Sequence, residues 1–444
     1  MKLPIHVSTC IAALEDAGYS AYAVGGCVRD WLLGLAPQDF DLCTSARPEQ
    51  IQQVFQGRGM VLSGLKHGTV GIIFDKEVVE ITTYRTEGSY SDNRHPDWVR
   101  FVDAVEADLA RRDFTVNAMA WSPTRGLQDP FGGAQDLKDR VLRAVGEPER
   151  RFREDALRIL RGARFAAKYR LTPEKNTYDA MQTLAPLMEN LARERVYSEL
   201  CKLIMVAQTE DILRYGFVIT QVIPELAPAV NFDQRCRYHA YDLFTHIAHV
   251  TAGVRPDLTL RWAGLLHDVG KIPCFTLDDQ GQGHFYGHAS VSAQMAEEIL
   301  LRLKAPTALR QEVVELIRQH MTYLEPDRQL LRRRLSRLGQ RRLELLLELQ
   351  SADMGSKGTG KEEATAHSQA LWQLLAQLLE EDACLTLRDL AINGKDLMAL
   401  GFPAGKLLGQ CLNALLEAVV DERLPNEKQP LLAAAQEYRK IHKA

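Results

Sequence analysis

Two glycines, an arginine and two alternating aspartates lie close together in the stretch AVGGCVRDWLLGLAPQDFDLCTSA, at 23–46. Gly25 and Gly26 follow a strand-like run and precede a helix-like one, where backbone N–H groups can approach an anion closely. Arg29, one turn along that helix, carries a guanidinium fork that suits phosphate oxygens. The stretch therefore predicts a site that handles phosphate.

Carboxylates next to this stretch predict a metal site. Asp39 and Asp41 flank Phe40 in an extended segment, whose period of two puts both carboxylates on one face and turns Phe40 towards the core. Adjacent carboxylates repel unless a cation lies between them, and Mg²⁺ prefers oxygen ligands and phosphate. Glu80, on the strand-like run VVEITTYR, is the candidate third carboxylate. The competing interpretation is a simple glycine turn and a solvated strand end.

The segment RRDFTVNAMA, residues 111–120, predicts the start of a helix. Asp113 and Asn117 are then four residues apart and share one face of that helix. Together with Arg112 they form a polar cluster that can bind ribose hydroxyls and phosphate.

A basic cluster lies on RFREDALRILRGARFAAKY, residues 151–169, whose apolar spacing predicts one amphipathic helix. Arg158, Arg161 and Arg164 recur every third residue, away from the apolar side. Either these arginines bind a nucleotide, or they form a face that is solvated or paired with Glu154 and Asp155.

The elements that position these clusters divide the 444 residues into an α+β front and a helical remainder. Short runs rich in β-branched and aromatic residues, which predict strands, are confined to the front: AYAVGG, FDLCT, VGIIF, VVEITTYR and RFVDAV. From about residue 147 onward the apolar residues recur at helical spacing. The segment GSKGTGKEEATA, at 355–366, predicts a linker.

Composition narrows the class of protein. Hydrophobic residues make up 46% and charged residues 25%, with a formal net charge of -4, as in ordinary globular proteins. No run of about 18 apolar residues predicts a membrane span, and the N-terminus does not resemble a signal peptide. The eight cysteines are scattered without a C-x-x-C pair, which predicts a reduced, cytoplasmic protein without a cysteine zinc site.

Five motifs, in this order, resemble those of the class II tRNA nucleotidyltransferases: the CCA-adding enzymes and their poly(A) polymerase relatives in the polymerase β superfamily. The motifs are G-G-x-V-R-D, D-x-D, R-R-D-x-x-x-N-A and E-D-x-x-R, followed by E-R-x-x-x-E within ERVYSEL at 194–200. The resemblance implies a small mixed-sheet, polymerase β-like head followed by an all-α neck and body. It also implies addition of CCA to tRNA 3′ ends from CTP and ATP.

The resemblance implies a role for each cluster. These roles are Mg²⁺ binding and catalysis for Asp39, Asp41 and Glu80, triphosphate binding for Gly25, Gly26 and Arg29, sugar and phosphate binding for Arg112, Asp113 and Asn117, and nucleotide contacts for Asp155, Arg158, Arg161 and Arg164.

In the family, the residues that align with Asp155 and Arg158 act as an amino-acid template. Cytosine and adenine both present an amine donor beside a ring-nitrogen acceptor, so a carboxylate accepts from the amine and an arginine donates to the ring. Uracil and guanine reverse that polarity and leave a buried charge unpaired.

Residues 85–99 occupy the place of a loop that full CCA-adding members carry, with Tyr90, Asp92, Arg94 and Pro96 in familiar positions. This loop favours addition of C, C and A, or at least of the final A. An A-adding enzyme or a poly(A) polymerase is the alternative, because these relatives share most of the motifs.

The helical part holds a second constellation, in which His246, the adjacent His267 and Asp268, and Asp353 form the pattern H…HD…D. This pattern, with LLHDVGK at its centre, is similar to that of the HD-domain metal-dependent phosphohydrolases. Imidazoles mixed with carboxylates suit a divalent first-row transition metal, whose bound water becomes a nucleophile near neutral pH. The resemblance also implies further candidate ligands at His284, His288 and His320, and a phosphate contact at Lys271.

The resemblance to HD proteins implies phosphatase or 2′,3′-cyclic phosphodiesterase activity, and the alternative is a scaffold without turnover. A function of another class also stays open at this point, namely an HD phosphohydrolase whose head only binds RNA.

Two C-terminal features concern RNA. Six arginines lie close together on a predicted pair of helices, and they indicate either contacts to the tRNA backbone or a solvated helix face. They are Arg332, Arg333, Arg334, Arg337, Arg341 and Arg342. The last part resembles the tRNA-contacting tail of Gram-positive-type CCA enzymes, with turn or close-approach glycines at Gly394, Gly401, Gly405 and Gly409.

The domains expected are a head at 1–145, a neck and body at 146–235, an HD metal domain at 236–355 and a tail at 356–444.

Overall fold

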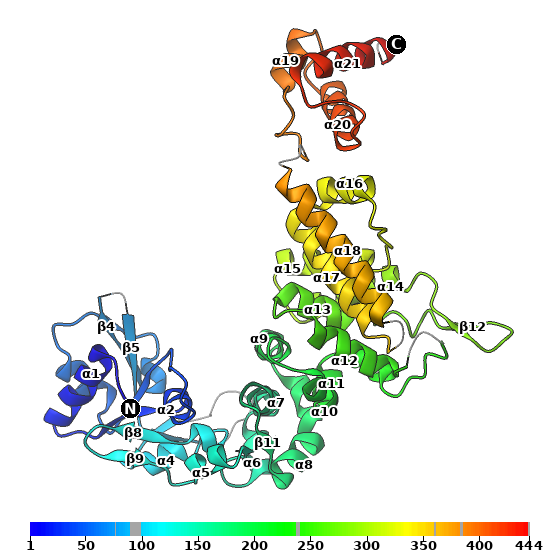
Figure 1. Ribbon diagram of the computed structural model, residues 1–444. Coiled ribbons are helices and arrows are strands. Elements are labelled where there is room, and N and C mark those ends of the chain that lie inside the picture. The colour runs from blue at the N-terminus through cyan, green and yellow to red at the C-terminus, as the bar shows by residue number, and fades with distance from the viewer. Residues whose placement is uncertain (76, 89–98, 237–239, 359–360, 382–384, 443–444) are drawn as a thin grey trace. The chain divides into compact units, whose positions relative to one another are not determined.

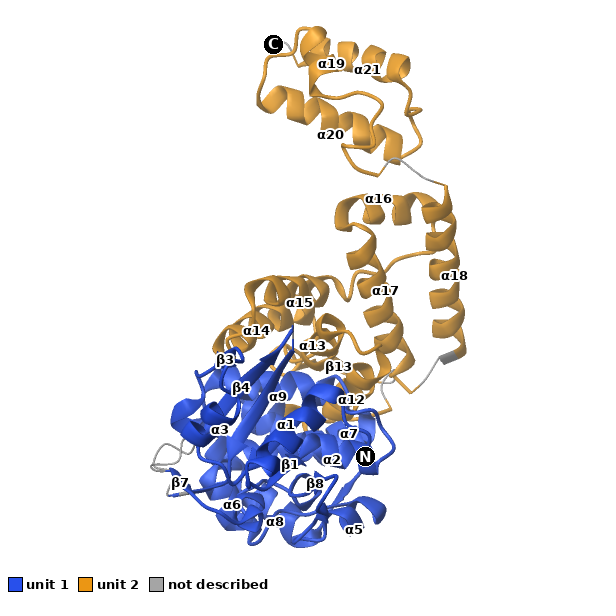
Figure 2. Ribbon diagram, turned by 90° about the vertical axis from the view of Figure 1, so that its left-hand side faces the viewer, with its two compact units in different colours: residues 1–227 blue, residues 228–444 orange. Residues whose placement is uncertain are grey.

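The computed structural model describes residues 1–75, 77–88, 99–236, 240–358, 361–381 and 385–442. The chain divides into two compact units, Met1–Ala227 (unit 1) and Pro228–Ala444 (unit 2), which are coloured separately in Figure 2. Among the described residues, no helix has the length and apolar character that a membrane span requires.

Unit 1 contains a seven-stranded mixed sheet in the order β3-β4-β5-β2-β1-β8-β9, of which Figure 1 labels β4, β5, β8 and β9. Its strands are β1 (Ala21–Val24), β2 (Asp41–Thr44), β3 (Met60–Val61), β4 (Thr69–Phe74), β5 (Glu77–Thr83), β8 (Ala120–Ser122) and β9 (Gly126–Gln128). Within this sheet β2 and β5 run parallel and the other neighbours run antiparallel. The predicted mixed-sheet head is confirmed.

The helices of unit 1 pack around this sheet and continue into a helical half. They are α1 (Ile5–Asp16), α2 (Gly26–Leu32), α3 (Pro48–Val54), α4 (Val105–Leu109), α5 (Gly133–Lys138), α6 (Pro148–Glu154), α7 (Leu157–Tyr169), α8 (Lys175–Leu184), α9 (Arg193–Ile204), α10 (Thr209–Arg214) and α11 (Gly216–Val222). Short 3₁₀ helices are η1 (Leu65–His67), η2 (Thr115–Asn117), η3 (Ala185–Asn190) and η4 (Pro224–Ala229). Two short pairs of strands complete the unit, β6 (Arg85–Glu87) with β7 (Val99–Phe101) and β10 (Val141–Leu142) with β11 (Thr172–Pro173).

The single helix predicted over 151–169 is wrong, because α6 ends at Glu154 and α7 begins at Leu157. Asp155 lies between them in an extended conformation, with φ -147 and ψ 103. Its carboxylate accepts a hydrogen bond from the backbone N–H of Leu157. In a continuous helix that N–H would donate to a backbone carbonyl, so the side chain of Asp155 supplies an alternative acceptor where the helix breaks.

The helix start predicted over 111–120 is also wrong. That segment contains only the 3₁₀ turn η2 and then enters β8. Asp113 accepts from the N–H of Phe114 and from the side chain of Asn117, so local side-chain hydrogen bonds replace the helical ones.

Unit 2 is helical apart from the short hairpin of β12 (Thr276–Leu277) and β13 (Gly283–His284). Its helices are α12 (Leu243–Gly253), α13 (Leu258–Leu266), α14 (His288–Arg302), α15 (Thr307–Gln319), α16 (Arg328–Leu338), α17 (Gln340–Gly355), α18 (Lys361–Glu380), α19 (Gly394–Ala399), α20 (Lys406–Val420) and α21 (Lys428–Ile441). The linker predicted at 355–366 is partly wrong, since α18 already begins at Lys361.

Candidate active site of the head and candidate metal centre of unit 2

The phosphate turn and the acidic residues meet at one end of the sheet. Val24, the last residue of β1, pairs with Asp41, the first residue of β2. On the other side of β2, Leu42 pairs with Ile81 in parallel register, so Asp41 and Glu80 each stand one residue before that pair and face the same side of the sheet.

The three carboxylates of this site are accessible. Asp39, Asp41 and Glu80 are exposed, and Phe40, which was predicted to face the core, is only half-buried. Desolvation by the surrounding head raises the pKa of Asp41, Arg112 opposes that effect and the charge of Asp39 adds to it. The aspartates are therefore close enough to repel each other, as a cation site between them requires.

Gly25 makes the turn between β1 and α2. Its φ is +75°, and a Cβ built there would lie 2.7 Å from Nη1 of Arg112. Its own N–H donates to the carbonyl of Met119, at the entrance to β8. Only glycine fits this position, because any side chain would meet both the backbone strain and the guanidinium.

A buried chain of hydrogen bonds joins four of the predicted nucleotide residues. Arg29 donates from Nη1 to Oδ1 of Asn117, and Nδ2 of Asn117 donates to Oδ1 of Asp113 at 3.0 Å. Arg161 of α7 donates from Nε and Nη2 to Oδ2 of Asp113 at 2.8 and 2.6 Å. The chain crosses from α2 through η2 to α7, so the head and the helical half of unit 1 share one polar network.

Asp113 is the ionised centre of this network. Although burial works against the charged form, Arg161 and the hydrogen bond from Asn117 hold the pKa of Asp113 well below its usual range. With four N–H groups donating to it, this buried carboxylate is held in one orientation.

Of the expected template residues, Asp155 lies in the break between α6 and α7, and Arg158 is the second residue of α7. The backbone N–H of Arg158 donates to the carbonyl of Asp155 at 3.0 Å, but no hydrogen bond joins their side chains among the described residues. Asp155 accepts from Nη2 of Arg195, on α9, at 2.7 Å. Arg158 is 9% exposed and donates to Oε2 of Glu154 at 2.8 Å and to the carbonyls of Arg111 and Arg151. The interpretation of a solvated arginine face is therefore wrong at this residue, and the pairing with Glu154 is confirmed.

Arg164 is likewise paired, with Nε donating to Oε2 of Glu199 on α9 at 2.6 Å. Two ion pairs thus connect α9 to this region: Arg195 with Asp155, in the break before α7, and Glu199 with Arg164 of α7. The motif E-R-x-x-x-E carried this signal, but sequence reasoning gave Arg195 and Glu199 no role.

The loop residues Tyr90, Asp92, Arg94 and Pro96 lie outside the described residues, between β6 and β7.

The second constellation is a cluster of six buried side chains inside unit 2. They come from five helices or their ends, and they are His246 of α12, His267 and Asp268 after α13, His288 of α14, His320 after α15 and Asp353 of α17.

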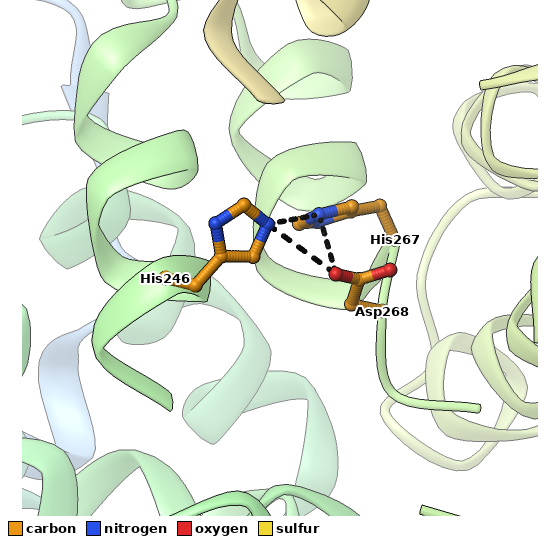
Figure 3. Close-up of side chains that lie close together, drawn as sticks. All are labelled: His246, His267 and Asp268. Carbon is orange, nitrogen blue, oxygen red and sulfur yellow. Dashed lines mark hydrogen bonds and ion pairs between the residues drawn. The ribbon is translucent and has the colours of Figure 1, made fainter. Parts of the chain in front are cut away.

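Two groups of three ligand atoms share Asp268, with the atoms of each group within 4.8 Å of one another. In one, Nε2 of His246 and Nε2 of His267 lie 3.3 and 3.2 Å from Oδ2 of Asp268, as Figure 3 shows. In the other, Nε2 of His288 and of His320 lie 3.3 and 3.7 Å from Oδ1. Asp353 adds Oδ1 at 3.1 Å from His246.

Backbone carbonyls orient these imidazoles. Nδ1 of His267, His288 and His320 lies 2.9, 2.7 and 2.6 Å from the carbonyl oxygen of the residue three positions earlier. A proton on Nδ1 leaves the Nε2 lone pair directed at the cluster, the arrangement that metal-ligating histidines use. Nε2 of His288 and of His320 is buried and makes no hydrogen bond among the described residues.

The charge balance of the cluster also suits a cation. Although burial opposes it, Asp268 and Asp353 raise the pKa of His246 to about 9 and themselves keep pKa values below the usual carboxyl range. Lys271 lies 2.8 Å from Oδ2 of Asp268 and also donates to the buried Gln234. Buried carboxylates and imidazoles facing inward fit a divalent first-row metal.

His284 does not belong to this cluster. It lies on β13, half-buried, with Nε2 2.8 Å from Oδ2 of Asp278 and its ring stacked on Tyr286. Of the three additional candidate ligands, the structure brings His288 and His320 to the centre and leaves His284 outside it.

Some of the predicted RNA-contacting arginines are already paired with the tail. Arg332 is buried and bonds to Glu422, while Arg333 bonds to Asp421 at 2.5 Å. Both carboxylates follow the C-terminus of α20, so these two arginines fasten α16 to the tail. Arg337 and Arg342 are exposed and have no ion-pair partner within the described part of unit 2.

The glycines predicted in the tail differ in role. Gly401 and Gly405 take positive φ values of 84° and 137° at turns, whereas Gly394 begins α19 and Gly409 lies inside α20.

Three models of known protein families match parts of the chain. Residues 21–143 match the family described as "Poly A polymerase head domain". Residues 170–229 match the "Probable RNA and SrmB- binding site of polymerase A", and 283–435 match "tRNA nucleotidyltransferase domain 2 putative".

Similar solved structures cover the whole chain. The crystal structure of the Bacillus stearothermophilus CCA-adding enzyme in complex with CTP superposes with a TM-score of 0.68 at 29% identity, covering 100% of this chain and 99% of that one. The Thermotoga maritima CCA-adding enzyme complexed with tRNA shares the fold, with a TM-score of 0.61 at 19% identity over 98% and 96% of the two chains.

Curated relatives match over nearly the same length. The CCA-adding enzyme of Levilactobacillus brevis is 33% identical over 428 residues, 96% of this chain and 95% of that protein. The CCA-adding enzyme of Bacillus velezensis is 32% identical over 419 residues, 94% of each. With this identity along its whole length, the chain belongs to the family of CCA-adding enzymes, the tRNA nucleotidyltransferases.

Proposed function

We propose that this chain builds the 3′ end of tRNA by adding C, C and A from CTP and ATP at the sheet end of unit 1. The observation that carries the proposal is the register that sets the Gly25 turn, Asp41 and Glu80 side by side at one end of β1, β2 and β5. Family membership supports the choice of reaction, and the related Bacillus stearothermophilus enzyme was crystallised with CTP.

The side chains divide the work of nucleotidyl transfer. Asp39 and Asp41 would hold Mg²⁺, which when bound activates the primer hydroxyl and neutralises triphosphate charge. The backbone N–H groups after Gly25 lie at the start of α2, where they suit phosphate oxygens. Asp113 and Asn117, held rigid by their buried network, would orient the ribose.

Arg158 has the donors that base selection needs. Three of its five N–H groups are used by Glu154 and two carbonyls, and those on Nε and one on Nη2 have no partner among the described residues. These unpaired N–H groups of Arg158 would donate to the ring nitrogen of cytosine or adenine, while the carboxylate of Asp155 accepts from the exocyclic amine. Uracil and guanine would place a ring N–H against the donors of Arg158 and a carbonyl oxygen against the carboxylate of Asp155, so they would bind poorly.

Incorporation of labelled CTP and ATP, alone and together with Mg²⁺, into tRNA ending at the discriminator base, in CC or in CCA tests the proposal. Two C and one A followed by arrest support it. Addition to CC ends only would indicate an A-adding enzyme, and long A tails a poly(A) polymerase. Asp41→Asn should abolish incorporation; if incorporation persists, the head is not catalytic and the RNA-binding alternative gains.

We further propose that unit 2 binds divalent metal at Asp268 and its surrounding histidines and hydrolyses phosphoester bonds there. The observation that favours this second activity is the pair of ligand groups sharing Asp268. When bound, such a metal lowers the pKa of its water enough to supply a nucleophile near neutral pH. Lys271, 2.8 Å from Asp268, lies where it can meet a phosphate oxygen.

The test of this second activity is hydrolysis of p-nitrophenyl phosphate and of 2′,3′-cyclic AMP with Mn²⁺, Co²⁺, Ni²⁺ or Mg²⁺. His267→Ala should remove any hydrolysis and leave CTP incorporation intact. Metal binding without turnover of either substrate would indicate a structural centre.

A further inference from the structure

The donors of Arg29 are almost fully used inside unit 1. A guanidinium carries five N–H groups. Nε and Nη2 donate to Oδ1 of Asp30 at 2.9 and 2.7 Å, Nη1 donates to Asn117, and Nη2 also donates to the hydroxyl of Tyr169. One N–H, on Nη1, is left without a partner among the described residues. Arg29 is 6% exposed, so this arrangement holds it in one orientation.

Tyr169 contacts Arg29 through both its hydroxyl and its ring. It is the last residue of α7 and is 5% exposed, and its ring centroid lies 4.2 Å from Cζ of the guanidinium. Phe165, one turn earlier, stacks on Tyr169 with centroids 6.2 Å apart and lies 5.3 Å from the same Cζ. A helix of the neck therefore holds the arginine of the phosphate turn by a hydrogen bond and a cation–π contact.

The orientation of Arg29 determines that of Asn117. Because Arg29 donates to Oδ1, the amide must turn Nδ2 towards Asp113, where it donates at 3.0 Å. Any rotation of the guanidinium would remove the partner of Oδ1 and free the amide to flip. Tyr169 thus stands at the start of a chain whose far end is Asp113.

We propose that Tyr169 is a positioning residue for nucleotide binding, which acts through Arg29 on Asn117; the inference rests on the proposed transfer of CTP and ATP. Tyr169 fixes the remaining N–H of Arg29 for the triphosphate and the Asn117 amide for the ribose. It has no part in reading the base, because neither Arg29 nor Asn117 belongs to the Asp155–Arg158 pair.

This placement predicts a distinctive kinetic pattern. Arg29 and Asn117 are proposed to contact the triphosphate and ribose of the bound nucleotide before transfer, so losing these ground-state contacts should raise KM and leave kcat nearly unchanged. Tyr169→Phe keeps the ring and removes the hydroxyl, which leaves a buried N–H of Arg29 without a partner. The KM values for CTP and for ATP should each rise roughly tenfold, and the preference for CTP over UTP should not change.

The experiment measures kcat and KM for CTP and ATP together with their Kd by titration calorimetry, in wild type, Tyr169→Phe and a matched control. Tyr178→Phe is that control, because its hydroxyl bonds to the carbonyl of Arg214 in the helical half of unit 1. Unchanged KM and Kd in Tyr169→Phe would overturn the inference, as would a fall in kcat alone. A wild-type protein that binds nucleotides but transfers none would refute the proposed function, while the Kd ratio would still decide this inference.

A double-mutant cycle tests whether Tyr169 acts through Arg29. In the background of Arg29→Lys, which lacks the Nη2 donor, Tyr169→Phe should change KM less than about twofold. Full additivity of the two effects would show that Tyr169 acts by another route.

Discussion

Asp155 is held by Arg195, whose Nη2 donates to its Oδ2 at 2.7 Å, and not by its expected partner Arg158. The other oxygen, Oδ1, accepts from the N–H of Leu157. Each carboxylate oxygen retains a free lone pair, so Asp155 can still accept from a base amine. Arg195, from α9, therefore orients the acceptor of the base-selecting pair.

Replacing Arg195 by Ala should weaken nucleotide choice. The carboxylate of Asp155 would lose the hydrogen bond that Arg195 donates to it. The ratio of kcat/KM for CTP to kcat/KM for UTP should then fall roughly tenfold, while kcat/KM for CTP itself should fall by a smaller factor. Arg170→Ala is a matched control, because Arg170 forms an exposed pair with Asp211 at 2.6 Å and should leave the ratio unchanged. An intact ratio in Arg195→Ala would contradict the orienting role.

The stability of unit 1 should depend on Asp113 in a pH-dependent way. Its pKa is lower in the folded chain than the unfolded value of about 3.9, so its contribution is complete above that value and is lost as the pH falls towards the folded pKa. Asp113→Asn should destabilise at pH 7 by about 1–3 kcal/mol, because Arg161 loses its acceptor.

Thermal unfolding at pH 7, 5 and 3.5 measures this effect. The Tm difference between wild type and Asp113→Asn should be about 5 °C at pH 7 and shrink at pH 3.5. Asp179→Asn, in an exposed pair with Lys175, should change Tm little at any of these pH values. A difference that stays constant down to pH 3.5 would rule out the ionised Asp113 as its source.

The number of metal ions bound per chain should show whether both ligand groups use Asp268. Asp268→Ala removes the ligand common to both groups, so metal content after dialysis should fall to background. His320→Ala removes a ligand of one group only and should lower metal content by about half. His284→Ala, outside the cluster, should retain the wild-type content. Equal losses in His320→Ala and His284→Ala would disprove the placement of the second group.

The arginines of α16 and α17 should separate by salt dependence. Arg337 and Arg342 are exposed and without ion-pair partners among the described residues, so Ala at both should reduce the slope of log K for tRNA against log salt by up to about 2. Arg332 is buried against Glu422. Arg332→Ala should therefore leave that slope unchanged and loosen the tail, which limited proteolysis detects. A reduced slope in Arg332→Ala would mean that it contacts RNA directly.

The local parts of the site could be predicted from the sequence, and the long-range parts could not. The turn at Gly25 and the strand of Glu80 followed from glycine and β-branched residue patterns. The strand alternation expected from Asp39 to Asp41 did not hold, because β2 begins only at Asp41 and Phe40 is half-buried. The break at Asp155 was missed because apolar spacing continues through it, while its carboxylate takes the N–H of Leu157. The pairs Asp155–Arg195 and Arg29–Tyr169 join residues 40 and 140 positions apart. Helical and strand spacing relates only residues a few positions apart, so it cannot predict such contacts.

The histidine cluster illustrates the same limit. His246, His267, Asp268 and Asp353 could be identified by pattern, but the choice among three further histidines needed the packing of α14 and α15. His288 begins α14 and His320 follows the end of α15, so both side chains reach the cluster, whereas His284 lies on a hairpin beside Asp278.

The most direct test of the central claim is to sequence every 3′ end made when the protein receives tRNA lacking CCA, Mg²⁺ and all four nucleoside triphosphates at equal concentration. A CCA-adding enzyme should give ends in CCA, with intermediates in C and CC, no U or G, and no extension beyond A. Ends that carry U or G, runs of A, or an unchanged discriminator base would contradict that claim.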